Sequence, residues 1–493
     1  MTGSVPIRAI VGRFSQVYSH RAIEDVLRVR PFAFCAILSS GVEPRFFSTI
    51  PRDHQEWFIS SEVRGCEYRT VDFGSLLPID EALVEDMREC EAVFMDMVAR
   101  LEWKRQISFQ TRRRWYLRHL RFWNDYIERH RINLYLSAWT PHEIPDIIIY
   151  YLCKKKGISV LFFECASMLR DTSFAEHDWE EGAIQIRHRY EELLREYNEV
   201  TDPLCIPLTP SYEERYRALT SAQGSKPPAY YRQWKPQWDK FIKTVRQTPA
   251  VLLRYAAQYC TLTGIKRLVS TWQRRRVIRA RNAFYDTHAI MPDLNRPFVY
   301  LPLHFQPEQA TTPLAGGFAD QILIVGLLNS YLPDGVSIYV KEHPWDSGWL
   351  NRSVDSYKDF LELPKVRLIA RSVDTFALRE HCRAVATATG TAGAEALFRG
   401  KPVLLFGHRF YQYAPGVYRI RSADDCARAI HAIFVEQKAP TLFESRLHLK
   451  AMEDTRVHGA LDPEHVDVSE LPGEVHSTAH SQAILDKLAQ WFN

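Results

Sequence analysis

The C-terminal half of the chain alternates short apolar runs with segments whose apolar residues recur at helical spacing. The apolar runs predict strands and cover residues 298–303, 336–340, 366–369, 384–389 and 402–406. Helices are expected between them, over 317–332, 353–363, 373–382 and 392–399. Strands that are apolar on both faces are typical of a parallel sheet covered by helices on both sides. This half therefore predicts a Rossmann-like α/β domain.

The N-terminal half carries a fainter version of the same pattern. Strands are expected over 33–39, 132–138 and 158–164, a helix over 145–156 and a long helical stretch over 79–130. Residues 212–290 are mostly helical and polar, which indicates a bridging or inserted segment. The final helix, 481–492, has an apolar stripe that must dock on another surface. We therefore expect an α/β protein whose boundaries divide the chain into 1–211, 212–290, 291–475 and 476–493.

Composition narrows the class of protein. The 493 residues are 46% hydrophobic and 25% charged, the balance of a soluble globular protein rather than a disordered or collagen-like chain. The 63 basic and 59 acidic residues leave a net charge of +4, too small to indicate a nucleic-acid partner. Nine scattered cysteines without a CxxC pair argue against a zinc site or a disulfide framework and favour a reducing compartment.

Neither a signal peptide nor a membrane span is evident in the sequence. The N-terminus lacks the apolar run of a signal peptide, and no apolar segment approaches the roughly 20 residues that span a bilayer. We therefore expect a cytoplasmic protein, at most held at the inner face of the cytoplasmic membrane.

The richest candidate for ligand binding is the segment 384–407, where a predicted strand ends in a turn of threonine and glycine. Glycine lets backbone amides approach an anion closely, and the start of a helix favours negative charge, so this turn predicts a phosphate or diphosphate site. Glu395, in the first helical turn, is placed to accept hydrogen bonds from a ribose. The other interpretation is a plain tight turn, with Glu395 complementing the helix dipole. The candidate residues are Thr389, Gly390, Thr391, Ala392, Gly393 and Glu395.

Two further strand ends carry polar side chains, at the edge of the sheet where open α/β folds bind ligands. The first follows the strand at 336–340, and its candidates are Lys341, Glu342, His343 and Pro344. The second follows the strand at 298–303, and its candidates are His304, Gln306, Glu308, Thr311 and Thr312. Each could be only a solvated turn, but three such loops on one sheet predict a nucleotide site.

Candidates for a general base lie in the N-terminal half, also after predicted strands. His142, Glu143 and Glu164 could each remove the proton from an acceptor hydroxyl. The alternatives are helix capping for His142 and Glu143, and a structural carboxylate at a domain interface for Glu164.

Two basic runs, 112–121 and 266–281, interleave arginines with Trp115, Tyr116 and Trp272. Each is either a solvated helix face or a basic amphipathic surface that contacts anionic lipid headgroups or a charged glycan.

Three motifs together resemble a known family. LPLHFQPEQATTP, VKEHP and TGTAGAEALFRGKPVLLFG, in this order and spacing, are similar to bacterial capsule polysaccharide biosynthesis proteins, which are related to the capsule Kdo transferases and have a GT-B-like fold. The resemblance is strong over 297–420 and fainter over 132–170, and it does not extend to 212–290.

The resemblance implies two Rossmann-like domains facing a cleft, with the nucleotide-sugar in the C-terminal domain and the acceptor in the N-terminal one. It implies that His343 and Pro344 lie beside the donor phosphate. It places Thr389, Gly390, Thr391, Gly393 and Glu395 around the nucleotide and ribose. It also implies that the terminal helix crosses back to the N-terminal domain and that neither metal nor cofactor is needed.

The function expected on these grounds is a metal-independent glycosyltransferase that moves a sugar from a nucleotide-sugar to a capsule or other surface glycan. The acceptor would be a glycan or lipid-linked glycan, with possible contact to an anionic membrane. The alternatives are a polyol-phosphate transferase with a CDP donor, a nucleotide-sugar epimerase, and a non-catalytic nucleotide-binding scaffold of a glycan assembly complex.

Overall fold

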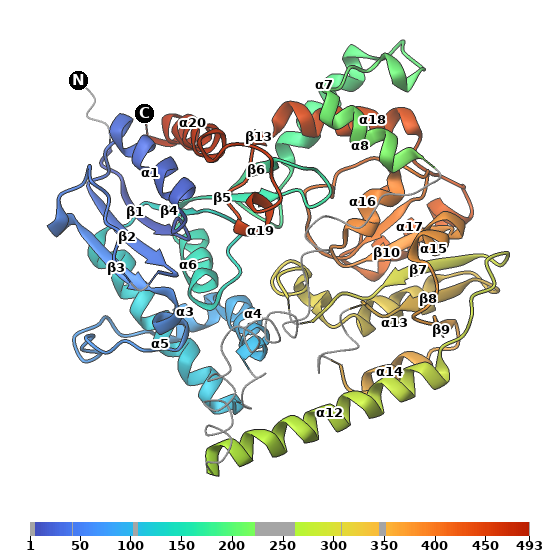
Figure 1. Cartoon of the computed structure of the whole chain (residues 1–493), viewed down its shortest axis with the longest axis horizontal. Helices are drawn as coiled ribbons and strands as arrows, with labels where there is room; N and C mark the ends of the chain where they lie inside the picture. Colours follow the sequence, from blue (N-terminus) through green and yellow to red (C-terminus); the bar gives the residue numbers. More distant parts are fainter. Residues whose placement is uncertain are drawn as a thin grey trace, which may run out of the picture.

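The computed structural model describes residues 5–41, 43–101, 107–221, 262–306, 308–344 and 352–492. Much of the expected bridging segment, residues 222–261, lies outside the described residues, as does the part of the His343 loop beyond Pro344. Within the described ranges the chain forms two α/β units, each built on its own sheet (Figure 1). The predicted fold class, two Rossmann-like domains, is confirmed.

The N-terminal sheet has seven strands in the order β13–β6–β5–β4–β1–β2–β3. Its five strands β1 to β5 pair in parallel, and β6 and β13 are antiparallel additions at one edge. The strands are β1 (Arg8–Gly12), β2 (Phe34–Ser39), β3 (Gln55–Ile59), β4 (Leu134–Ser137), β5 (Ser159–Cys165), β6 (Thr172–Glu176) and β13 (Val457–His458).

The C-terminal sheet has six parallel strands in the order β12–β11–β10–β7–β8–β9. Its strands are β7 (Phe298–Pro302), β8 (Ser337–Lys341), β9 (Val366–Leu368), β10 (Ala384–Thr387), β11 (Val403–Leu405) and β12 (Val417–Arg419). The chain runs outward from β7 to β9 and then returns to the other side of β7 with β10. The crevice between β7 and β10 is therefore the topological switch point at which open α/β sheets bind ligands.

Helices surround both sheets. In the N-terminal unit they are α1 (Val17–Val29), α2 (Ser60–Arg64), α3 (Glu81–Asp86), α4 (Arg88–Val98), α5 (Phe109–His130) and α6 (Ile144–Lys155). The next two, α7 (Ile184–Glu196) and α8 (Pro210–Thr220), pack against the C-terminal unit instead. Those that follow are α12 (Leu262–His288), α13 (Ile322–Tyr331), α14 (Val354–Leu361), α15 (Thr375–His381), α16 (Thr391–Leu397), α17 (Ala423–Phe434), α18 (Leu442–Thr455), α19 (Pro463–Val466) and α20 (Gly473–Phe492). Short 3₁₀ helices are η1 (Arg52–His54), η2 (Ala99–Leu101), η3 (Pro203–Cys205) and η4 (Gly316–Ala319).

Several expected elements differ in the structure. The long helical stretch at 79–130 is divided into α3, α4 and α5, because Met87 leaves the helical conformation between the first two. The helix expected from 317 begins only at Ile322, after the 3₁₀ turn η4. The central strand β1 was missed because its five residues are too few to show a period, although Ala9, Ile10 and Val11 are fully buried.

The chain returns to the N-terminal unit after the C-terminal sheet. The return begins before residue 476, the boundary expected from the sequence, because β13 already pairs with β6. Helix α20 then packs against α1, with Ile484 and Leu488 buried among apolar residues of the N-terminal core. The Ser477 hydroxyl donates to the Tyr18 carbonyl at 2.8 Å, which fixes the register of the two helices. The segment between β13 and α20 is thereby held beside the C-terminal ends of β4 and β5.

Among the described residues, no helix combines the length and apolar character needed to cross a bilayer.

Candidate active site

A cleft of about 540 Å³ lies between the two units. That volume is within the range of about 300–1,000 Å³ common for small-molecule sites. Its walls come from loops that follow β4, β7, β8, β10 and β11, from the end of β5, and from the segment around α19. The carboxyl ends of parallel strands from both sheets therefore meet at one cavity, which includes the switch point between β7 and β10.

The predicted glycine-threonine turn after β10 is part of the cleft wall, and His304 holds it in place. The Thr389 amide donates to His304 Nε2 at 3.2 Å, and the Gly390 amide donates to Thr387 Oγ1 at 2.9 Å. A Cβ at Gly390 would lie 2.8 Å from Thr387 Oγ1, so a side chain there would force the turn apart. Two of the amides expected to bind an anion are thus used within the protein. Thr391 and Ala392 start helix α16, so their amides have no acceptor inside that helix and can reach a ligand.

His304 is neutral and its tautomer follows from its contacts. Because Nε2 accepts from the Thr389 amide, the proton must reside on Nδ1. Burial, and then the neighbouring His343, Arg352 and Arg409, lower the pKa of His304 to about 3. His304 therefore brings to the cleft wall a neutral ring with a protonated Nδ1 rather than a positive charge.

His343, after β8, also lines the cleft. Burial and then the charge of Arg352 lower the pKa of His343 to about 4, so this ring is neutral at physiological pH as well. The sequence-predicted residues that the structure brings to the cleft wall are Glu164, His304, Glu308, His343, Thr389, Gly390, Thr391 and Ala392.

Arg409 is a cation of the cleft wall that sequence analysis missed. It follows β11, and its guanidinium Nη1 lies 3.0 Å from Glu164 Oε1 at the end of β5 in the other unit. Both side chains are about nine-tenths buried. Burial raises the pKa of Glu164, while Arg409 and the Phe410 amide oppose that rise. The pair joins the two sheets across the floor of the cleft. The signal available in the sequence was the segment GHRF, which follows the apolar run 402–406 at the end of a predicted strand.

A second missed group is the segment Asp462–Asp467, which carries three carboxylates and His465 into the cleft from the N-terminal side. Burial alone would raise the pKa of Asp462, but His465 and the Glu464 amide hydrogen-bond to this carboxylate and lower its pKa below the ordinary value. Loss of hydration and then repulsion from Asp462 raise the pKa of Glu464. Glu464 is therefore the more basic carboxylate of this wall.

Three predicted donor-site residues point away from the cleft, which corrects the prediction for each. Lys341 Nζ donates to the Arg371 carbonyl at 2.8 Å, on the β9 side of the sheet. Glu342 pairs with Arg371 at 2.5 Å in the interior of the unit. Glu395 is buried in ion pairs with Arg379 and with Arg215, so it is a structural carboxylate rather than a ribose acceptor.

The other predicted residues outside the cleft wall have local roles. Gly393 packs against Tyr411, whose hydroxyl would lie 2.8 Å from a Cβ there. The Gln306 amide donates to the Ala319 carbonyl, and the Thr311 hydroxyl donates to the Glu308 carbonyl at 3.0 Å. Thr312 is buried, and Pro344 ends the described part of its loop.

On the N-terminal side, neither His142 nor Glu143 lines the cleft. His142 Nδ1–H donates to the Thr140 carbonyl at 2.8 Å, and Glu143 lies 3.2 Å from Arg64. Of the three candidate bases, only Glu164 is in the wall, where it pairs with Arg409.

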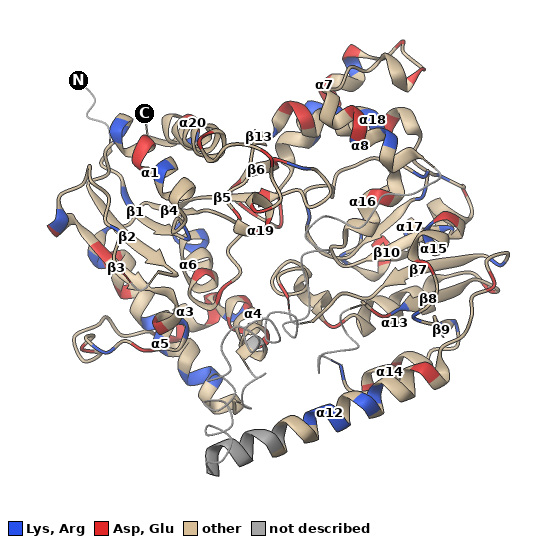
Figure 2. Cartoon of the chain, viewed as in Figure 1, with Lys and Arg blue, Asp and Glu red and all other residues tan. Residues whose placement is uncertain are grey.

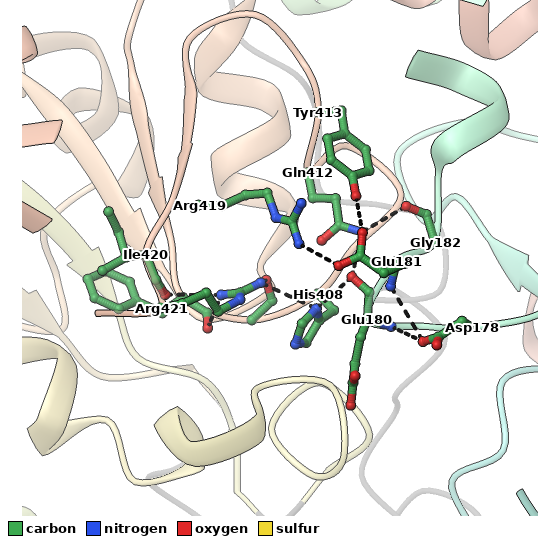
Figure 3. Close-up of polar contacts among 12 residues, drawn as sticks. Asp178, Glu180, Glu181, Gly182, His408, Gln412, Tyr413, Arg419, Ile420 and Arg421 are labelled. Carbon is green, nitrogen blue, oxygen red and sulfur yellow. Dashed lines mark hydrogen bonds and ion pairs between the residues drawn. The ribbon is translucent and has the colours of Figure 1, made fainter. Parts of the chain in front are cut away.

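The loop that carries Arg409 is also tied to the N-terminal unit by a set of polar contacts (Figure 3). Gln412 Nε2 donates to the Gly182 carbonyl at 2.8 Å, and the Tyr413 hydroxyl donates to Glu181 at 2.7 Å. His408 Nδ1–H donates to the Glu180 carbonyl at 3.0 Å. We call this set, the turn 178–182 with residues 408–421, the interdomain latch. It fixes the position of Arg409 relative to the N-terminal sheet.

A family model described as "Capsule polysaccharide biosynthesis protein" matches residues 254–459 of this chain. The resemblance to the capsule polysaccharide biosynthesis family is confirmed. The capsule family match spans the C-terminal sheet, and it contains His304, His343 and Arg409. No curated protein sequence matches the chain at a significant level.

Solved structures similar to this chain include two transferases and an epimerase. A beta Kdo 2,7 transferase, KpsC of Thermosulfurimonas dismutans, is 12% identical with a TM-score of 0.31, over 79% of this chain and 95% of that chain. A UDP-GlcNAc 2-epimerase from Methanocaldococcus jannaschii is 9% identical with a TM-score of 0.25, over 91% and 100%. A glycosyltransferase from Rickettsia africae is 10% identical with a TM-score of 0.25, over 99% of each chain. At these levels the neighbours assign neither substrate nor reaction to this chain.

The interdomain latch predicts a pH dependence of stability. Burial, and then Arg421, lower the pKa of His408 to about 4. Between that value and the ordinary value of about 6.5, the unfolded state binds a proton that the folded state does not, so acidification destabilises the fold. The contribution of neutral His408 to the free energy of unfolding is fully present above about pH 6.5. It is lost at about 1.4 kcal/mol per pH unit as the pH falls towards 4.

In His408→Gln the free energy of unfolding should therefore fall less steeply between pH 6.5 and 4, because the contribution of one histidine is removed. Urea denaturation across that pH range measures the difference. His54→Gln, at an exposed histidine, is the control and should leave the slope unchanged. Equal slopes for wild type and His408→Gln would contradict the assignment.

Proposed function

We propose that this protein is a glycosyltransferase that moves a sugar from a nucleotide-sugar donor to a capsule or other surface polysaccharide. The observation that carries the proposal is the division of the cleft into two chemically different walls. Arg409 and hydrogen-bond donors lie on the C-terminal wall together with Glu308, and four carboxylates lie on the N-terminal wall, those of Glu164, Asp462, Glu464 and Asp467. The match to the capsule family over residues 254–459 supports the same assignment.

The C-terminal wall suits the phosphate groups of a nucleotide-sugar. Arg409 provides a positive charge, and a guanidinium can bind phosphate oxygens through two parallel hydrogen bonds. The amides of Thr391 and Ala392 are donors at the same wall. In glycosyl transfer negative charge develops on the leaving phosphate, so donors held rigidly around it stabilise the transition state.

The N-terminal wall suits an acceptor hydroxyl. Glu464 is our candidate for the general base, because its raised pKa makes it a better proton acceptor than an ordinary carboxylate. Asp462 is beside it and raises its basicity. Glu164 is assigned a positioning role instead, because its partner is Arg409.

Transfer without a divalent metal belongs to the same proposal. Arg409 and the backbone amides supply the positive potential that a metal would otherwise give to the leaving phosphate.

The experiment that tests the function begins with thermal-shift measurements against CMP, UDP, GDP and CDP, because a ligand that binds the folded state raises its stability. Nucleotide release is then followed with sugar donors of the stabilising base and capsular oligosaccharide acceptors. We expect acceptor-dependent release that a chelator leaves unchanged. Conversion of the sugar without acceptor would indicate an epimerase, and a phosphorus-containing product would indicate a polyol-phosphate transferase.

Removal of the Arg409 charge should weaken donor binding selectively. Arg409→Ala would leave the buried Glu164 without its partner and would destabilise the fold. The double variant Glu164→Gln/Arg409→Gln removes both charges together. We expect its affinity for the nucleoside diphosphate to fall about tenfold to a hundredfold, the value of a charged hydrogen bond, measured by calorimetry. Arg189→Gln, which loses an arginine paired with Asp454 outside the cleft wall, is the matched control and should bind as wild type. Unchanged affinity in the double variant would remove Arg409 from the donor site.

Replacement of the candidate base should affect turnover rather than donor binding. Glu464→Gln is expected to lower kcat about a hundredfold or more, with little change in the donor KM. It should also abolish the loss of activity at low pH that protonation of Glu464 causes in wild type. Glu470→Gln, an exposed carboxylate close by in the chain, should have neither effect. A Glu464→Gln enzyme with wild-type kcat would exclude this residue as the base.

A further inference from the structure

Helix α12 presents a long face that the rest of the described structure leaves uncovered. Its C-terminal half is anchored on the C-terminal unit, where Tyr285 is fully buried and its hydroxyl donates to the Ile369 carbonyl at 2.7 Å. Arg281 is also buried, 3.8 Å from Glu342. Figure 1 shows the helix running along the outer edge of that unit, beside α14.

The opposite face carries apolar and cationic side chains on one stripe. Val269, Trp272, Arg276 and Arg279 follow the spacing i, i+3, i+7, i+10, which places them on the same side of an α-helix. All four are exposed, Trp272 by 61% and Val269 by 49%. The Arg276 guanidinium lies 5.8 Å from the centre of the Trp272 ring, so the aromatic and cationic groups form one surface.

The charge of this helix is strongly one-sided. Between residues 262 and 285 the sequence contains no aspartate or glutamate, and the basic residues are Lys266, Arg267, Arg274, Arg275, Arg276, Arg279 and Arg281. The whole chain, by contrast, has a net charge of only +4. Figure 2 shows the arginines along the described part of α12. So many positive charges on one helix repel one another, which costs free energy unless an anionic partner offsets the repulsion.

We infer that the exposed face of α12 binds an anionic lipid surface and holds the protein against a membrane. Charge complementarity accounts for the arginines, because cationic side chains are attracted to anionic headgroups. The exposed Trp272 and Val269 favour a lipid surface over other polyanions as the binding partner. An indole and an aliphatic side chain gain from insertion at the boundary of headgroups and acyl chains, whereas a nucleic acid or a charged glycan gives Val269 nothing to bury against. This inference stands independently of the transfer reaction proposed above.

The test is co-sedimentation of the full-length protein with vesicles of phosphatidylcholine, with and without phosphatidylglycerol. We expect binding only when phosphatidylglycerol is present, and weaker binding at high salt because the contacts are screened. Arg276→Glu/Arg279→Glu should lower the affinity at least tenfold. Trp272→Ala should also weaken binding, and its loss should persist at high salt because it is apolar in origin.

The matched control is Arg69→Glu/Arg217→Glu, which makes the same change in charge at two exposed arginines elsewhere and should bind vesicles as wild type. Unchanged thermal midpoints and nucleotide binding in all variants will show that the fold and the cleft are intact. Equal binding to both vesicle types, equal loss in the control, or tight binding to soluble nucleic acid in place of vesicles would each overturn the inference.

Discussion

The ion pair between Glu164 and Arg409 is the interaction on which the geometry of the cleft depends. A charge removed from water costs several kcal/mol unless an opposite charge is in contact with it, so neither side chain is stable in its buried position alone. Since one belongs to each sheet, the two units must approach until the pair forms. The interdomain latch then holds the same loop from the other side. Apolar packing acts at the same place, because Phe174 of β6 stacks on Phe410, the neighbour of Arg409 in the chain. The width of the cleft is therefore set by electrostatics and apolar packing together.

The same arrangement determines where charge resides within the cleft. The positive charge of Arg409 is one reason that His304 is neutral, and the mutual proximity of the two histidines disfavours a second cation. In the part of the chain that the structure describes, the C-terminal wall therefore offers the cation Arg409, neutral donors and the carboxylate of Glu308. The carboxylates of Asp462–Asp467 face it from the other unit. A substrate with a negative phosphate at one end and hydroxyl groups at the other fits this polarity in one orientation.

A site residue could be predicted from the sequence where its position follows directly from the strand that precedes it. His304, His343 and Thr389 were predicted correctly as neighbours, because the carboxyl ends of adjacent parallel strands meet at one edge. Lys341 and Glu342 were assigned to the same edge from their place after a strand, but side-chain direction at a strand end depends on the turn that follows. Glu395 was misplaced because Arg379 and Arg215, which draw it into the interior, are remote in sequence.

The sequence by itself determined the two α/β units, the basic run 266–281 and the three polar strand ends of the C-terminal sheet. Each of these depends on local periodicity, which a hydrophobic pattern records directly. Only the tertiary structure decided that Arg409 meets Glu164 and that Asp462–Asp467 forms the opposite wall. Those contacts join segments far apart in the chain, and the wall of Asp462–Asp467 exists because β13 and α20 return to the N-terminal unit. No local pattern of residues encodes which distant surface a returning segment will cover.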